Sequence, residues 1–326
     1  MIRPRFFSAL CVVGVAVWAA IGSATMSAQR ETAQAGATAA QAGAPPRVRA
    51  RKVVLAWADT RNGQAQHEFT SHALSVIERL GYESGAWDTF IRTDSNIIAK
   101  EPKKTTGEPA SGGPTLEMAD AIFFLGHRDV PIDEAQKKEL AAFVRDGKGF
   151  VAAHTALTAF DSWPEFGELI GGRYDGHPWH APGTVINEAP DFPATRHFPA
   201  TFNLNDEFYQ AKAFSPDARV LLRLDVSKMP PHAELRNQGF PLAWAKTYGK
   251  GRVFYSSFAH DAATWDNRDI AQMYFEAIKW ALGMSEGDVT PRPAAIPRQI
   301  AGRPSADRTG DRPSGRGTRN NDHRRP

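Results

Sequence analysis

Asp146-Gly147-Lys148-Gly149-Phe150-Val151-Ala152-Ala153-His154-Thr155-Ala156-Leu157 is the stretch of this chain that decides its fold. Gly147 is typical of a residue just past the end of a helix, and the apolar run from Gly149 to Ala153 predicts a short buried strand. Ala152 and Ala156 flank His154 at equal spacing, which is the pattern of a nucleophile elbow, a sharp strand-to-helix turn that accepts only small neighbours. An imidazole therefore stands where such a turn presents its nucleophile, unless His154 is a structural residue that only ends the strand.

Alternating strands and helices are predicted ahead of this stretch. Apolar runs predict strands over 51–58, 82–88 and 121–126, and the helical spacing of apolar residues predicts helices over 67–80 and 131–144. Gly81 is expected to end the first of these helices. The resulting βαβ order has connections long enough for right-handed crossovers, so it predicts an open, doubly wound, mostly parallel α/β sheet.

Less regular elements are predicted after this stretch. A short helix is expected within 160–172, and a final amphipathic helix is expected over 268–282. Further strands are predicted over 184–187, 220–225, 241–248 and 252–258. The last two flank Gly249-Lys250-Gly251, which indicates a β-hairpin added to the parallel sheet.

Neither end of the chain has the composition of a folded domain. Residues 1–28 combine two arginines, an apolar run and a small-residue exit, which predicts a cleaved secretory signal and a periplasmic or secreted protein. An uncleaved membrane anchor is the alternative, although the apolar run is short for a span. Residues 29–50 are predicted to be a flexible linker, and residues 285–326 a disordered basic tail rich in Pro, Gly and Arg. The folded domain is therefore expected over 51–284, with no membrane span left after cleavage.

Cysteine usage and charge exclude several classes of function. The single cysteine, Cys11, lies inside the predicted signal, so the mature chain would hold no thiol. This excludes a cysteine nucleophile, a disulfide framework and a thiolate metal site. The formal net charge is +3, but arginines at the two ends account for the excess and leave the region between them net acidic. Nothing in the folded region therefore indicates nucleic-acid binding.

Histidines and carboxylates fall at the predicted strand ends, where doubly wound sheets bind their ligands. His127 and His154 follow two of the parallel strands, and His260-Asp261 follows the strand over 252–258. Such groups suit general acid–base chemistry, because histidine titrates near neutrality and a neighbouring acid can orient its ring. We expect His154 to act as a base that is oriented by an acid of the Asp206-Glu207 pair. The expected catalytic residues are His154, Asp206, Glu207, His260 and Asp261.

Ordinary structural roles compete with two of these assignments. Asp206-Glu207 precedes two aromatic residues and would equally cap or solvate the edge of a strand. Asp261 would be a good N-cap for a following helix.

Metal and sugar contacts are further expectations for this site. His177 and His180 are the candidate ligands for a divalent metal such as zinc, although Pro178 between them argues against one helix face. The flat rings of Trp57 and Trp179 suit a contact with a sugar ring, although most buried tryptophans belong to a core. His127 is a further substrate-binding candidate.

Five motifs in a fixed order resemble the ThuA-like (trehalose utilisation) domain family. They are Gly147-Lys148-Gly149-Phe150-Val151-Ala152-Ala153-His154; Leu169-Ile170-Gly171-Gly172 with Gly176-His177-Pro178; Asp206-Glu207-Phe208-Tyr209; Trp244 to Tyr255 with His260-Asp261; and Trp280-Ala281-Leu282-Gly283. The resemblance spans about Lys52 to Gly283. His67 also lies where such domains tend to carry a histidine, which makes it another candidate for substrate binding.

The resemblance implies a flavodoxin-like fold of the class I glutamine amidotransferase type and a role in carbohydrate metabolism. It also implies a link to the use of disaccharides, including 3-keto sugars. This chain departs from the family pattern at two places. Gly147-Lys148-Gly149 replaces a Gly-Gly pair, and Ala259-His260-Asp261 replaces a Gly-His-Asp triplet, which keeps the side chains but loses backbone freedom.

Two classes of function fit these observations. The first is an exported enzyme that acts on a glycoside or keto-sugar through His154 and partner carboxylates, with or without a metal. The second is a non-catalytic carbohydrate-binding or scaffold domain that kept the fold without a nucleophile. A glutaminase fits poorly, because the mature chain would lack the cysteine. The expected partner in both classes is a small-molecule carbohydrate.

Overall fold

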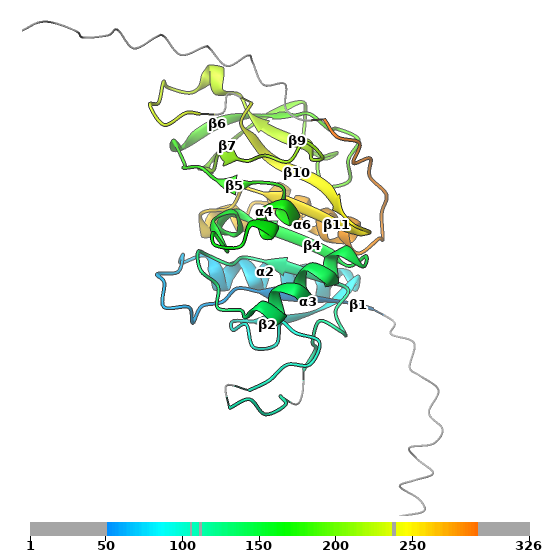
Figure 1. Ribbon diagram of the computed structural model, residues 1–326. Coiled ribbons are helices and arrows are strands. Elements are labelled where there is room, and N and C mark those ends of the chain that lie inside the picture. The colour runs from blue at the N-terminus through cyan, green and yellow to red at the C-terminus, as the bar shows by residue number, and fades with distance from the viewer. Residues whose placement is uncertain (1–50, 105, 111–112, 237–238, 293–326) are drawn as a thin grey trace, which may run out of the picture. The chain divides into compact units, whose positions relative to one another are not determined.

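Strands of a mixed sheet form the centre of the fold (Figure 1). The computed structural model describes residues 51–104, 106–110, 113–236 and 239–292. Within these ranges nine strands form one sheet in the order β2-β1-β3-β4-β11-β10-β9-β6-β7, and β5 pairs with β8 in a second sheet. The strands are β1 (Lys52–Trp57), β2 (Trp87–Arg92), β3 (Ala121–Phe124), β4 (Gly149–Ala153), β5 (Arg173–Tyr174), β6 (Trp179–Asn187), β7 (Thr201–Phe208), β8 (Ala211–Lys212), β9 (Arg219–Leu224), β10 (Pro241–Tyr248) and β11 (Gly251–Ser256). The helices are α2 (Thr70–Ser84), α3 (Glu134–Arg145), α4 (Pro164–Ile170), α5 (Ala262–Trp265) and α6 (Arg268–Ala281), with the 3-10 helices η1 (His154–Thr158) and η2 (Val226–Lys228).

The predicted α/β fold is confirmed, and its sheet has a parallel and an antiparallel half. Strands β2, β1, β3, β4 and β11 run parallel, as the βαβ order predicts. Strands β10, β9, β6 and β7 extend the sheet in antiparallel pairs, so this half is larger than one hairpin. The predicted hairpin joins β10 to β11 and marks the change of direction. Gly249 adopts φ 60° at this turn, a conformation that favours glycine.

Helices cover both faces of the parallel strands and enclose two apolar cores (Figure 1). Helices α2 and α6 pack on one face, where Ile77 joins the same cluster as Val54. Helices α3 and α4 pack on the other face, where Leu140 and Phe166 join the same cluster as Leu55. Successive side chains of a strand point to opposite faces, so β1 contributes to both cores. This double burial explains why β1 reads as a continuous apolar run.

The first predicted helix and the second predicted strand are both shifted along the chain. Helix α2 extends to Ser84, and Gly85, with φ 67°, ends it in place of Gly81. Gly81 instead lets the last turn of α2 lie against the indole of Trp87. A Cβ added at Gly81 would stand 2.4 Å from Trp87 Nε1. Strand β2 therefore begins at Trp87, after the helix has ended.

The antiparallel half brings two sequence motifs together. Strand β6 begins at Trp179, earlier than the predicted 184–187, and β7 is not predicted by the sequence pattern. Asn, Asp and Glu are poor strand formers and obscure the alternation of β7. The register of the pair places His180 opposite Glu207. The loop that carries His177 therefore lies beside the Asp206-Glu207 motif.

The predicted terminal segments are only partly described. The signal over 1–28 and the linker over 29–50 lie outside the described residues, as does 293–326 of the predicted tail. The remaining part, 285–292, runs beside β9, where the Val220 N–H donates to the Arg292 carbonyl at 3.2 Å. The described part of the chain contains no helix that is long and apolar enough to cross a membrane.

Candidate functional site

The site is built at the carboxyl ends of the parallel strands β4 and β11. Strand β4 ends at Ala153, and the chain turns at once into η1 at His154, whose φ is 37°. Strand β11 ends at Ser256, and its loop reaches Ala259, with φ 79°, directly before His260. Left-handed backbone at a non-glycine residue costs roughly 1–3 kcal/mol and collects at functional sites. Both histidines are therefore presented by strained turns.

His154 lies below the surface of the site. Its side chain is fully buried, and its Nδ1 lies 2.6 Å from the Ser257 carbonyl oxygen. A carbonyl oxygen only accepts, so Nδ1 carries a hydrogen and Nε2 faces the site. That nitrogen lies 3.0 Å from His260 Nδ1 and 3.4 Å from Glu207 Oε2. The role of His154 as a base stays a prediction, and in the structure both of its ring nitrogens contact protein groups.

Glu207 is the centre of the histidine cluster. Its Oε2 lies 3.1 Å from His260 Nδ1, and its Oε1 lies 3.3 Å from His177 Nδ1. Burial acts to raise the pKa of Glu207, but its close contacts with His154 and His260 outweigh it and hold the pKa well below its ordinary value. The bond to Glu207 in turn raises the pKa of His260, against the opposing effect of burial. Glu207 is therefore an ionised carboxylate shared by three imidazoles.

Asp206 faces away from the cavity, although it precedes Glu207 on β7. It is fully buried, and its carboxylate accepts the backbone N–H groups of Ala259 at 2.6 Å and His260 at 3.0 Å. It also accepts the N–H of Glu207 at 2.9 Å. Unlike Glu207, Asp206 does not line the cavity. Its role is to position the loop that carries His260.

The two predicted metal ligands contact different carboxylates. His180 Nε2 lies 3.2 Å from Asp261 Oδ2 at the exposed rim, whereas His177 contacts Glu207. Among the described residues, groups whose ligand atoms lie within 4.8 Å of one another include His67, His154 and His260, and also His180, Glu207 and His260. Of the two predicted ligands, His180 belongs to one of these groups and His177 to neither. Asp261 precedes α5, but its side chain makes no capping hydrogen bond.

Both tryptophans that were expected to contact sugar are core residues. Trp57 is fully buried and packs against Phe124, with ring centroids 4.6 Å apart. Trp179 turns to the other face of β6, where its indole N–H donates to the Pro230 carbonyl at 3.1 Å and its ring packs on Phe240. These two assignments are therefore wrong. Strand alternation separates Trp179 from its neighbour His180.

His67 and His127 both reach the cavity, as expected of substrate-binding residues. Their rings meet edge to face with centroids 4.9 Å apart, and His127 Nδ1 lies 3.2 Å from the Ala65 carbonyl. Burial lowers the pKa of His67 to about 4, with further lowering by the neighbouring His154. Burial also lowers the pKa of His127. Both imidazoles are therefore neutral at physiological pH.

The cavity beside Glu207 has a volume of about 640 Å³. Its wall combines imidazole, carboxylate and phenol groups: His67, His127, Tyr174, His177, Glu207 and Tyr209. Burial, followed by the charge of Glu207, raises the pKa of Tyr174 to about 12, and the same causes raise that of Tyr209. Both hydroxyls therefore stay protonated. Tyr209 ends the Asp206-Glu207-Phe208-Tyr209 motif, which is a usable signal, whereas Tyr174 carries no signal in the sequence.

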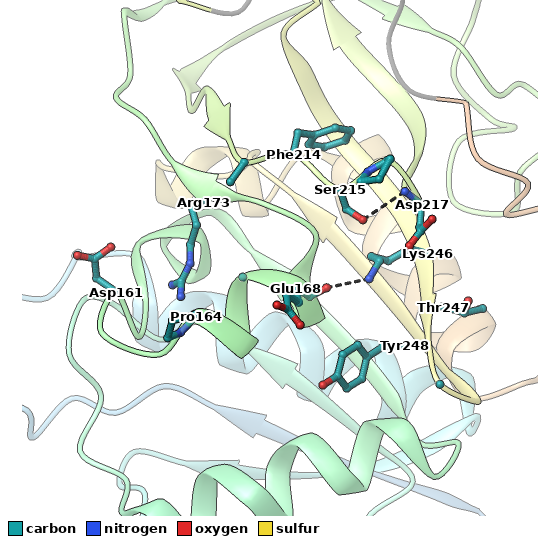
Figure 2. A pocket seen from close by; sticks show the side chains of 14 residues that line it. Asp161, Pro164, Glu168, Arg173, Phe214, Ser215, Asp217, Lys246, Thr247 and Tyr248 are labelled. Atoms are coloured by element: carbon teal, nitrogen blue, oxygen red, sulfur yellow. Dashed lines mark hydrogen bonds between the residues drawn. The ribbon is translucent and has the colours of Figure 1, made fainter.

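A second cavity of about 920 Å³ adjoins the first, and Asp161 lines both. Figure 2 shows its wall, where Lys246 Nζ donates to the Glu168 carbonyl at 2.8 Å. Arg173 also lines it and donates to backbone carbonyls, including that of Phe160 at 2.9 Å. No histidine of the described residues lines this cavity. Of these two cavities, only the smaller one is therefore lined by imidazole groups.

The family model for trehalose utilisation, ThuA, matches residues 53–281. This chain belongs to the ThuA family. The resemblance carried by the five sequence motifs is thereby confirmed. The description of the ThuA family links the chain to carbohydrate use.

Two solved structures share the fold of this ThuA-family chain. A ThuA-like protein from Bacteroides uniformis has a TM-score of 0.58 at 20% identity, over 76% of this chain and 98% of that one. A ThuA-like protein from Parabacteroides merdae has a TM-score of 0.55 at 16% identity, over 76% and 94%. No curated protein matches the sequence. The likeness to the two structures is one of fold.

Proposed function

We propose that this ThuA-family chain is an enzyme that acts on a disaccharide or its keto derivative by moving a proton at a sugar carbon. The carbohydrate class is supported by the family's link to trehalose utilisation. The reaction class is supported by the groups that line the smaller cavity, because imidazole, carboxylate and phenol are acid–base groups. These groups surround a volume of about 640 Å³, within the usual range for a small-molecule site.

The contact between His177 and Glu207 carries the proposal. Glu207 Oε1 lies 3.3 Å from His177 Nδ1, so Nε2 of the same ring is left out of this contact. Half of the His177 side chain is exposed, at the wall of the cavity. A carboxylate beside Nδ1 fixes the tautomer and orientation of an imidazole whose Nε2 then exchanges protons with a substrate. His177 is therefore the proton acceptor, and Glu207 is its orienting acid.

With a keto-sugar as the substrate, His177 and Glu207 would act on the carbon next to the keto group. His177 Nε2 takes the proton from the carbon next to the keto group, and the C–H electron pair moves toward the keto oxygen. The hydroxyl of Tyr174, which stays protonated because its pKa is about 12, donates to the developing oxyanion. The enolate then regains a proton or expels the leaving group on the neighbouring carbon. Glu207 supports the imidazolium that forms on His177.

Turnover of trehalose and of enzymatically oxidised 3-keto-trehalose tests this proposal, with and without added zinc. We expect the wild-type chain to convert the keto-sugar. Replacement His177→Gln should lower the rate by roughly 100-fold or more, the usual contribution of a general base. The matched control is His72→Gln, because His72 pairs with Asp266 at 2.9 Å on the exposed surface of α2 and should be dispensable.

The contradicting result would be binding of the sugar without turnover by wild type under every condition. That result would favour the second class, a carbohydrate-binding domain without catalysis. Equal rates for wild type and His177→Gln would overturn the role of His177 alone.

We also infer that the protein is exported to the periplasm or beyond, on the composition of residues 1–28. Amino-terminal sequencing of protein from cell fractions tests this inference. A mature chain that begins near residue 29 is expected, and a full-length cytoplasmic chain would contradict it.

A further inference from the structure

Three ligand atoms converge beside the smaller cavity, whose wall includes Glu207. His154 Nε2, His260 Nδ1 and Glu207 Oε2 form a triangle whose sides are 3.0, 3.1 and 3.4 Å. They come from three separate segments, the turn after β4, the loop after β11 and strand β7. The three residues are far apart in the sequence, so the fold brings them together.

The count of donors and acceptors in this triangle does not balance. The Ser257 carbonyl takes the Nδ1–H of His154, so a neutral His154 offers only a lone pair at Nε2. Glu207 Oε2 is also an acceptor, and it lies 3.4 Å from that lone pair. His260 Nδ1 carries at most one hydrogen for the two of them. A positive centre between the three atoms would resolve this, either an extra proton on the fully buried His154 or a cation.

The dimensions of the triangle suit a metal. Zinc binds imidazole nitrogen and carboxylate oxygen at about 2.0–2.1 Å, so its ligands in a tetrahedral site lie roughly 3.3 Å apart. The measured sides of 3.0–3.4 Å bracket this spacing without a rearrangement of the backbone.

We propose that His154, His260 and Glu207 form a site for one divalent transition-metal ion of the zinc type. His67 lies next to these ligands, because its ligand atom lies within 4.8 Å of those of His154 and His260, and it lines the cavity. A metal held there would lie beside the cavity in which we propose that the sugar binds. The proposal adds a cofactor to the proposed function and rests on it only for that sugar contact.

Two contacts outside the triangle hold the ligands in place. The Ser257 carbonyl fixes the tautomer and orientation of His154, as backbone carbonyls commonly do for metal-binding histidines. Asp206 accepts the backbone N–H groups of both His260 and Glu207. Asp206 therefore positions two of the three proposed metal ligands through their backbone.

The chemical types of the three ligands limit which metals this site would bind. Two imidazoles and one carboxylate suit zinc, cobalt, iron or manganese, whereas magnesium and calcium prefer oxygen ligands alone. The glutamate and the two histidines match the ligand types of hydrolytic zinc sites with an open position.

Metal binding can be measured without any substrate. The full-length protein, carrying no histidine tag and purified without chelator, is dialysed against zinc, and its bound zinc is measured by elemental analysis. We expect stoichiometric zinc in wild type, and zinc affinity at least roughly 100-fold weaker in Glu207→Gln and His260→Gln. Replacement by cobalt should give the visible absorption of a four-coordinate ion. Circular dichroism checks that each variant is folded.

Two matched variants separate this proposal from the proposed function. His177→Gln should lose turnover and keep its zinc, because His177 meets Glu207 at Oε1, whereas the proposed metal ligand atom is Oε2. His72→Gln should keep both. Zinc far below one equivalent in wild type, or equal zinc affinity in wild type and Glu207→Gln, would overturn the metal site and leave an extra proton as the positive centre. A zinc-loaded wild-type protein without turnover would overturn the proposed function only.

Discussion

Glu207 and Asp206 are adjacent residues of β7 with different roles. Glu207 turns toward the cavity and meets His177 with Oε1 and His260 with Oε2. Asp206 turns away and binds three backbone N–H groups. The sequence can indicate that this acidic pair belongs to the site. It cannot tell the two apart, because the strand that alternates them is itself not predicted.

Replacement Asp206→Asn should lower the free energy of unfolding by roughly 1–3 kcal/mol, the cost of a buried polar group that loses its partner. An asparagine side chain replaces one of the two acceptor oxygens with an NH₂ group that only donates, so it cannot accept all three N–H groups as the carboxylate does. Urea denaturation measures the effect. Asp261→Asn is the control, because Asp261 is at the rim and should change stability by less than about 0.5 kcal/mol. Equal stabilities for the two variants would contradict the positioning role.

Other single residues show the limit of composition as a guide. Histidine and carboxylate at strand ends indicate the site because the topology brings such ends together. Tryptophans do not, because an indole packs in a core as readily as it covers a sugar. Trp57 is fully buried for this reason, and Trp179 faces Pro230 rather than the cavity.

At the scale of elements, the contact between α2 and β2 predicts that one glycine-to-alanine replacement in a helix destabilises the protein. Replacing an exposed helical glycine by alanine stabilises a helix by about 1 kcal/mol. Gly81→Ala should instead destabilise the protein by roughly 1–3 kcal/mol, because overpacking against a buried ring forces side chains and backbone to move. The new Cβ would meet Trp87 Nε1 at 2.4 Å. Thermal and urea unfolding measure the change.

Ser75→Ala on the same helix is the control, because Ser75 is exposed. Its stability should stay within about 0.5 kcal/mol of wild type. A more stable Gly81→Ala protein would show that α2 does not lie against Trp87 as described.

Elements with strong periodicity are the ones that the sequence predicts. Strands β1, β3, β4 and β11 are short apolar runs, and α6 has a clear apolar face, so all five lie close to their predicted ranges. Strand β7 carries polar residues at an edge of the sheet, and the two-residue strands β5 and β8 are too short to leave a pattern. These unpredicted elements hold Glu207 and Tyr174, which explains why the cavity wall is only partly predictable.

For the whole molecule, the site is a product of topology rather than of any one motif. Its histidines precede α2 and follow β3, β4 and β11, and its carboxylate comes from the antiparallel half of the sheet. A βαβ order is sufficient to predict that the parallel strand ends meet. It does not predict which loop of the antiparallel half covers them, since that depends on the β6–β7 register. The family motifs indicate which loop this is, because they contain His177 and Glu207 together with the strand-end histidines.

We propose that the cavity beside Glu207 moves a proton at a sugar carbon, with His177 as the acceptor. Deuterium uptake into 3-keto-trehalose in D₂O, followed by proton NMR, tests it most directly. We predict loss of the signal from the carbon next to the keto group with wild type and His72→Gln, and a rate roughly 100-fold lower with His177→Gln. No uptake with zinc-supplied wild type, or equal uptake with His177→Gln, would contradict the account.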